Sequence, residues 1–117
     1  MLLAGLGGCE SEPLGPFPVT NATDSFEIPA IDLSDLTTTV DYRWRNSGLY
    51  ARVNHATTTV SGGASVLIRD AFGTIVYERA LSPSLNQSSL IGSPGIWTIS
   101  VTVTAFTGTL GFQVQKR

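Results

Sequence analysis

The sequence predicts an all-β protein: a single antiparallel β-sandwich of about seven to eight strands, preceded by an extended N-terminal arm. Its 117 residues are about the length of one domain. Hydrophobic residues make up 42% and charged residues 14% of the chain, and the valine, isoleucine and aromatic side chains among them favour strands. From Phe26 onward, short runs of alternating polar and apolar residues end at turn residues, with no helical periodicity between them.

The charge pattern argues against nucleic-acid binding. The formal net charge is −2 and the arginines are scattered along the chain, whereas nucleic-acid-binding domains normally carry a basic face. Lysine occurs once, as Lys116, and threonine and serine supply much of the polar surface, a composition that favours export. No stretch approaches the roughly 20 apolar residues of a membrane-spanning helix, so contact with a membrane would need an anchor or a partner.

The only cysteine, Cys9, directly follows an apolar stretch of small residues. The run Leu6-Gly7-Gly8-Cys9 resembles the lipobox at the end of a bacterial lipoprotein signal peptide, which implies that diacylglycerol is attached to the Cys9 sulfur. The eight residues before it are shorter than a signal peptide, so we expect the natural start to lie upstream. The alternative is a flexible glycine-rich tail with an incidental thiol. Cys9 has no second cysteine with which to form a disulfide within the chain.

These features divide the chain into three parts. Residues 1–8 are predicted to end a signal-peptide-like segment, residues 9–23 to form a lipidated tether, and residues 24–117 to form the sandwich. The prolines within 13–18 fix the backbone and remove hydrogen-bond donors. We therefore expect an extended tether that pairs with no strand.

The first half of the sandwich is predicted to contain three strands. Phe26–Ile28 is expected to begin an edge strand, because Pro29 cannot donate to a ladder. Residues 37–46 alternate as a half-buried strand. After the turn residues Asn46-Ser47-Gly48, the alternation over 49–54 predicts a hairpin partner for that strand. The side chains expected on the inner face are Val40, Tyr42, Trp44, Leu49, Ala51 and Val53.

The second half is predicted to contain two hairpins. The first covers residues 66–78, where Asp70 begins and Gly73 closes a tight connection. A polar loop follows, and then a strand over 96–104. Gly108 is predicted to turn the chain into a final strand over 110–114, and both glycines are expected at positive φ. The residues expected in the core are Val40, Trp97, Ile99, Val101, Val103, Phe112 and Val114.

Four segments of this second half carry a family resemblance. Residues 66–70, 73–76, 95–99 and 108–114 resemble the bacterial pre-peptidase C-terminal domain and its jelly-roll relatives. The shared features are an Asp-x-x-Gly hairpin, a glycine-aromatic entry to the penultimate strand and a glycine before the last strand. The resemblance covers about fifty residues and implies a β-sandwich. In that family the domain is an appendage of secreted enzymes, whereas no enzyme is attached here.

No catalytic site is recognisable in the sequence. His55 is the only histidine, and a zinc site needs three or four ligands, so we expect a solvated or hydrogen-bonded histidine. No Gly-x-Ser-x-Gly sequence presents a nucleophile. A hydrolase would require His55 beside a serine and a carboxylate. We therefore predict no enzyme, no catalytic residue, no cofactor and no metal site.

Two binding sites remain as alternatives. Calcium could be held if the carboxylates of one segment converged, although they lack the spacing of a dedicated calcium loop. These carboxylates are Asp24, Glu27, Asp32 and Asp35. Trp44 and Trp97 could form a sugar-stacking platform, but their alternation with apolar residues favours the core. A carbohydrate- or calcium-binding module is thus the alternative function.

The leading hypothesis is a non-enzymatic structural or accessory protein, anchored by lipid on the exported, periplasmic side of a bacterial membrane. We expect contact with the membrane through Cys9, and with another membrane or periplasmic protein through the sheet faces or loops. A larger membrane complex fits this reading, including an energy-transducing one of the photosynthetic or respiratory kind. No nucleic-acid partner is expected.

Overall fold

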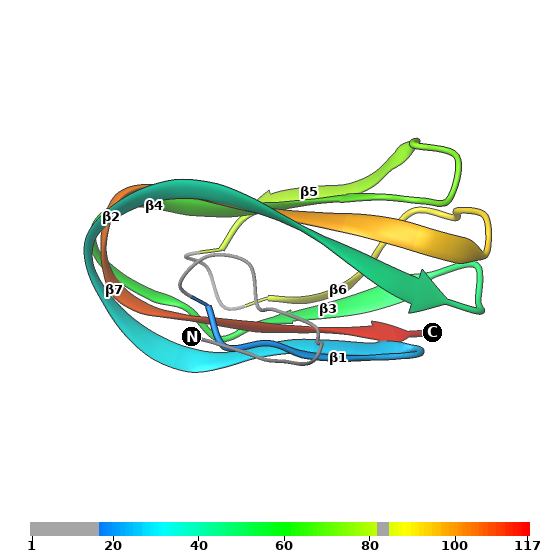
Figure 1. Ribbon diagram of the computed structural model, residues 1–117, viewed down its shortest axis with the longest axis horizontal. Helices are drawn as coiled ribbons and strands as arrows, with labels where there is room; N and C mark the ends of the chain where they lie inside the picture. Colours follow the sequence, from blue (N-terminus) through cyan, green and yellow to red (C-terminus); the bar gives the residue numbers. More distant parts are fainter. Residues whose placement is uncertain (1–16, 82–84) are drawn as a thin grey trace, which may run out of the picture.

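The computed structural model describes residues 17–81 and 85–117, and these form an antiparallel all-β structure without a helix. Figure 1 shows one sheet that is curled back on itself into two facing layers. Its seven strands are β1 (Thr20–Ala22), β2 (Ser25–Asn46), β3 (Ala51–His55), β4 (Thr58–Arg69), β5 (Ile75–Ala80), β6 (Asn86–Ser88) and β7 (Gly95–Lys116). The predicted fold class, a β-sandwich-like all-β fold, is confirmed.

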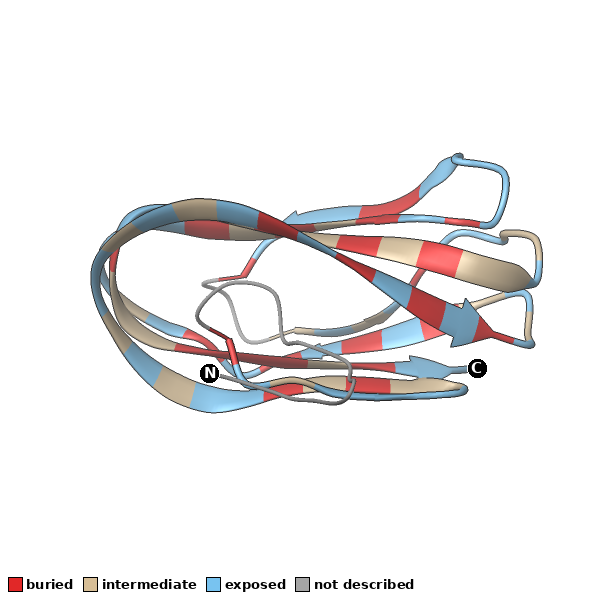
Figure 2. Ribbon diagram, in the orientation of Figure 1, coloured by how far each residue is buried: buried red, intermediate tan, exposed pale blue. Residues whose placement is uncertain are grey.

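Two long strands connect the layers. In the first layer, residues 25–33 of β2 and 108–115 of β7 pair with each other and are flanked by β1 on one side and by β3 and β6 on the other. In the second layer, residues 36–46 and 95–106 of the same two strands pair, and β4 and β5 extend the layer. The core lies between the two layers (Figure 2), where buried and exposed residues alternate along most strands.

All three long strands change direction at one end of the molecule, which we call the bend end (residues 29–36, 58–63 and 104–110). The pairing of β2 with β7 shifts register three times there, and the pairing of β4 with β7 shifts twice. Such bulges bend a strand and increase its twist. Gly62 at φ +75° and Ala105 at φ +44° adopt left-handed conformations in this region. The backbone itself therefore produces the bend.

The opposite end, which we call the loop end, gathers four connections: residues 23–24, 47–50, 70–74 and 89–94 (Figure 1). Two aspartates fasten these connections together. Asp24 accepts hydrogen bonds from the Ser47 backbone at 2.7 Å and from its hydroxyl at 2.8 Å. Asp70 Oδ1 accepts from the N–H groups of its own turn, and its Oδ2 accepts from Ser93 N–H at 3.0 Å.

The core matches the inward phases that the alternation predicted. Trp44 and Trp97 are paired in register, fully buried, and packed edge to face with ring centroids 6.0 Å apart. Each indole N–H donates to a backbone carbonyl. Buried core residues named from the sequence are Val40, Tyr42, Ala51, Val53, Ile99, Val101, Val103, Phe112 and Val114. Leu49 is the exception, since it is 45% exposed at the loop end.

Three predictions about the arrangement of the strands were wrong. Phe26–Ile28 is not an edge segment, because β2 continues through Pro29 and pairs with both β1 and β7. Pro29 lies in a register shift, where the ladder requires no N–H from it. β3 pairs with β6 and β7 instead of forming a hairpin with β2. Alternation reveals which face of a strand is buried but not which strand lies beside it.

Gly108 was the third error. Its φ of +152° is positive, as expected, but it lies inside the continuous strand β7 and not in a hairpin turn. A Cβ at this position would lie 2.2 Å from the Thr58 carbonyl oxygen. Glycine is therefore required because β4 and β7 approach closely at the bend end. Gly73, at φ +87°, closes the β4–β5 hairpin as predicted.

The folded body also includes residues that the sequence assigned to the tether. Phe17 is 1% exposed and belongs to the core, and β1 pairs with β2 from Thr20. The segment is too short to show a clear alternation, and its packing depends on Phe17 and the partly buried Val19. The remainder of the predicted tether, including Cys9, lies outside the described residues.

Candidate binding groove between β5 and β6

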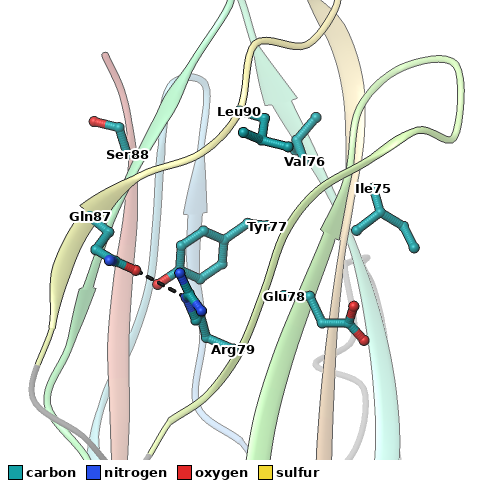
Figure 3. Close-up of a pocket in the computed structure, with 8 residues that line it drawn as sticks. All are labelled: Ile75, Val76, Tyr77, Glu78, Arg79, Gln87, Ser88 and Leu90. Atoms are coloured by element: carbon teal, nitrogen blue, oxygen red, sulfur yellow. Dashed lines mark hydrogen bonds between the residues drawn. The ribbon is translucent and has the colours of Figure 1, made fainter.

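A hollow of about 340 Å³ lies along one side of the sandwich, between the last strand of each layer. Among the described residues, β5 pairs only with β4 and β6 pairs only with β3. The residues that line the hollow are Ile75, Val76, Tyr77, Glu78, Arg79, Gln87, Ser88 and Leu90 (Figure 3). We call this hollow the β5–β6 groove.

The backbone of β5 faces the groove at alternate residues. Antiparallel strands exchange hydrogen bonds at every second pair. Leu81 N–H donates to the Ala64 carbonyl, so the bonded pairs with β4 include Val66 with Arg79. The N–H and C=O of Glu78 therefore point away from β4. The Val76 carbonyl points the same way and accepts from Leu90 N–H at 2.8 Å, which covers one end of this edge.

A polar pair spans the gap between the two layers. Arg79 Nε donates to Gln87 Oε1 at 3.1 Å, and Figure 3 shows the two side chains extending toward each other. Arg79 is opposite the buried Val66 and Gln87 is opposite the buried Val53. Both side chains are thus on the inner faces of their layers. Together they cover the side of the core between β5 and β6, which do not pair with each other.

Beneath this pair lies a buried hydrogen bond between Tyr77 and His55. The Tyr77 hydroxyl and His55 Nε2 are 2.8 Å apart, and the rings meet at 90°. Burial raises the pKa of Tyr77, and the charge of Arg79 opposes that shift only in part. His55 is 3% exposed and its backbone N–H donates to Leu85. The expectation of a hydrogen-bonded histidine is therefore confirmed, and here it ties β3 to β5 across the core.

The side chains that line the groove offer several kinds of group for recognition. Its lining combines a guanidinium, a carboxylate, an amide and apolar side chains around an open backbone edge. The described residues contain no group of three histidine, cysteine, aspartate or glutamate side chains placed to hold a metal ion. The hydrogen bond that Tyr77 makes with His55 connects the lining of the groove to the core.

The carboxylates named as calcium candidates do not converge. Asp24 lies at the loop end and is engaged by Ser47, whereas Asp32 lies at the bend end and accepts from the Thr109 hydroxyl at 2.7 Å. Asp35 also lies at the bend end, at φ +49°. The tryptophans named as sugar candidates are fully buried. Neither alternative site is assembled from the residues named for it.

Asp70 has a structural role that its turn position only partly predicted. Burial disfavours the charged carboxylate, but N–H groups from Thr74, Ser93, Phe72 and Gly73 outweigh it and lower the pKa of Asp70. The Asp-x-x-Gly pattern predicted the turn. The bond to Ser93 depends on a residue 23 positions away, and no local pattern could have indicated it.

Comparison with known proteins gives no match to a family model, to a curated protein or to a solved structure. The resemblance to the pre-peptidase C-terminal domain therefore stays a prediction. Within residues 17–81 and 85–117, no helix has the length and hydropathy needed to cross a membrane.

Proposed function

We propose that this protein is a non-catalytic accessory subunit, anchored by lipid at Cys9, that binds an extended segment of a membrane-associated partner protein along β5. The observation that carries the proposal is the open edge of β5 in the β5–β6 groove. A strand edge with unpaired N–H and C=O groups is a template for another strand. Peptide recognition by strand addition uses such edges, with backbone bonds giving affinity and side-chain pockets giving specificity.

The groove supplies both kinds of contact. The outward backbone groups of Glu78 supply hydrogen bonds, and the apolar side chains of Ile75 and Leu90 border the same hollow. An extended segment bound in the groove would lie between β5 and β6 and would cover the Arg79–Gln87 pair. Pairing with a second copy of β5 is less favourable, because a two-fold axis at Glu78 or Arg79 places like charges opposite each other.

The membrane location rests on the sequence. The Leu6-Gly7-Gly8-Cys9 run resembles a lipobox, and the proline-containing residues after it suit a spacer. A lipidated chain on the exported side of a bacterial membrane meets the periplasmic parts of membrane complexes. A photosynthetic or respiratory complex is one such host.

A pair of variants at one position tests the strand-addition proposal. Glu78→Pro removes the outward N–H without removing a bond to β4, and proline is tolerated on strand edges. Glu78→Ala removes the side chain but keeps the N–H. Each variant is expressed in the native host, purified from membranes in mild detergent, and its co-purifying proteins are quantified by mass spectrometry.

We expect one partner to be lost with Glu78→Pro and retained with Glu78→Ala. Circular dichroism and thermal unfolding of both variants establish that the fold persists. Retention of every partner by a folded Glu78→Pro variant would contradict binding at this edge. Equal loss with both variants would assign the binding to the carboxylate instead.

A further inference from the structure

The loop end carries most of the large hydrophobic side chains that are exposed in the described residues. Six large hydrophobic residues are exposed in the described part of the chain, and five lie on or beside the loop-end connections, while Val60 lies at the bend end. The five are Phe72 (84% exposed), Leu90 (70%), Ile91 (60%), Leu49 (45%) and Ile75 (42%). Exposed apolar residues are ordinary when scattered, but a contiguous group marks an interaction site.

Hydrogen bonds bring these side chains together. Gly92 N–H donates to the Leu49 carbonyl at 2.7 Å, which places Ile91 beside the β2–β3 connection. Leu90 N–H donates to Val76, and Figure 3 shows Leu90 next to Val76 with Ile75 nearby. Leu49, Ile75, Leu90 and Ile91 thus lie on neighbouring segments at the loop end.

The loops that carry these residues are held in place by a carboxylate. Asp70 Oδ1 accepts from Phe72 N–H at 3.0 Å, and its Oδ2 accepts from Ser93 N–H at 3.0 Å. The hairpin turn and the β6–β7 connection are therefore fixed to the same side chain. Phe72 extends from an anchored turn and does not fold back on the core, so its exposure is imposed by the local structure.

Charge is distributed unevenly along the molecule. Basic residues at or near the loop end are Arg45, Arg69, Lys116 and Arg117, and its two aspartates are Asp24 and Asp70. Lys116 lies 3.6 Å from Asp24 Oδ2, so the three arginines outnumber the one remaining carboxylate, Asp70. The bend end contains Asp32 and Asp35, and none of its residues is lysine or arginine. An apolar surface bordered by basic groups suits an anionic lipid bilayer, which attracts lysine and arginine near its surface.

The chain before the sandwich is long enough for Cys9 to reach a bilayer that the loop end contacts. Phe17 precedes the loop-end residue Asp24 by seven residues, a span of at most about 25 Å. Cys9 precedes Phe17 by eight residues, which span at most about 28 Å. A lipid on Cys9 and the loop end can therefore contact one bilayer together.

We propose that the loop end docks on an anionic lipid bilayer, with Phe72, Leu90 and Ile91 entering the interfacial region. This inference rests in part on the proposed lipid tether, since the tether supplies the nearby membrane. Leu90 belongs both to this surface and to the adjacent end of the β5–β6 groove, so docking covers that end of the groove. The end that contains Glu78 and Arg79 stays open to a partner in the same membrane.

Vesicle binding of the full chain without its lipid tests the docking separately from the anchor. The protein carries Cys9→Ser, and its flotation is measured with vesicles of phosphatidylcholine containing phosphatidylglycerol and with phosphatidylcholine alone. We expect binding to the anionic vesicles, weakened by 0.5 M salt as charges are screened. Adding Phe72→Ser and Ile91→Ser should reduce the binding constant by about tenfold or more. Val60→Ser is the matched control and should change nothing.

Three outcomes would overturn the inference. The first is the absence of flotation with anionic vesicles. The second is equal flotation of the parent protein and the variant that carries Phe72→Ser and Ile91→Ser. The third is a loss of vesicle binding with Val60→Ser that equals the loss with that double substitution. Sedimentation of the same samples shows whether the apolar surface instead joins two copies of the chain, which would also overturn it. Mass analysis of native protein at Cys9 reports on the anchor independently, so failure of either proposal is recognised separately.

Discussion

The two ends of the sandwich are built in different ways. At the bend end, close backbone contacts and positive φ angles redirect the strands, as at Gly62 and Gly108. At the loop end, two aspartate side chains collect N–H groups from neighbouring connections, as Asp70 does from Phe72 and Ser93. At Gly62 and Gly108, a side chain would clash with the backbone of the neighbouring strand. Carboxylate anchoring holds the loop-end connections in place while large apolar side chains such as Phe72 and Ile91 stay exposed, so the loop end is the more suitable place for membrane docking.

The largest effect on the free energy of unfolding is expected at the bend end, where one of two neighbouring glycines has no room for a side chain and the other does. A Cβ on Gly62 would lie 2.1 Å from the Ala105 carbonyl oxygen, at φ +75°, whereas a Cβ on Gly63 would have no atom within 4 Å. Gly62→Ala should lower the free energy of unfolding by about 3 kcal/mol or more. Gly63→Ala should change it by less than about 1 kcal/mol. Urea unfolding measures both, and equal effects would show that backbone contact does not determine the bend.

A smaller effect is expected at the loop end from Asp70→Asn. The amide replaces one acceptor oxygen with a donor, so at least one of the N–H groups that Asp70 binds is left unpaired. The free energy of unfolding should fall by about 1–3 kcal/mol. Asp41→Asn, at an exposed position on β2, should change it by no more than about 0.5 kcal/mol. Similar losses in the two variants would remove the distinction between an anchoring carboxylate and a surface one.

The same anchoring predicts a loss of stability in acid. The pKa of Asp70 is lowered by the N–H groups that outweigh its burial, and the pKa of Asp24 is lowered by the Ser47 backbone and hydroxyl. A lowered pKa in the folded state gives stability that is complete above the unfolded pKa, about 3.9, and that disappears as the pH falls below it. The difference in unfolding free energy between wild type and Asp70→Asn should therefore shrink below about pH 4. A difference that is constant from pH 7 to pH 2 would contradict this account.

The smallest effect is expected beneath the β5–β6 groove. Tyr77→Phe removes the hydroxyl that lies 2.8 Å from His55 Nε2 and keeps the ring. The free energy of unfolding should fall by about 1 kcal/mol, with no change in the vesicle binding assigned to the loop end. Chemical denaturation and vesicle flotation provide the two measurements. A large effect on flotation would mean that the two regions are coupled.

Period-two alternation was sufficient to predict the fold class and the buried faces. The inward positions of Trp44, Trp97 and Val101 could be assigned because one face of each strand contacts the core. The β4–β5 hairpin could be predicted because Asp70 and Gly73 determine its turn locally. These successes share a cause, since each depends on residues close together in the sequence.

The pairing of strands and the groove could not be predicted in this way. β2 was divided at Pro29 because a bulge that accommodates proline is a tertiary feature. The meeting of Arg79 with Gln87 requires both layers to be in place. The exposed loop-end residues have ordinary apolar side chains, and only the folded arrangement shows that Phe72 and Ile91 remain outside the core.

Intact-mass analysis of the native protein tests the central claim, attachment to a membrane through Cys9, most directly. We predict a mature chain that begins at Cys9 and carries two or three acyl groups. Each buried CH₂ contributes about 0.8 kcal/mol, so two or three chains hold the domain at the bilayer where one would be marginal. Cys9→Ser should remove the modification and release most of the protein from membranes. A native protein with an unmodified Cys9 would contradict the account.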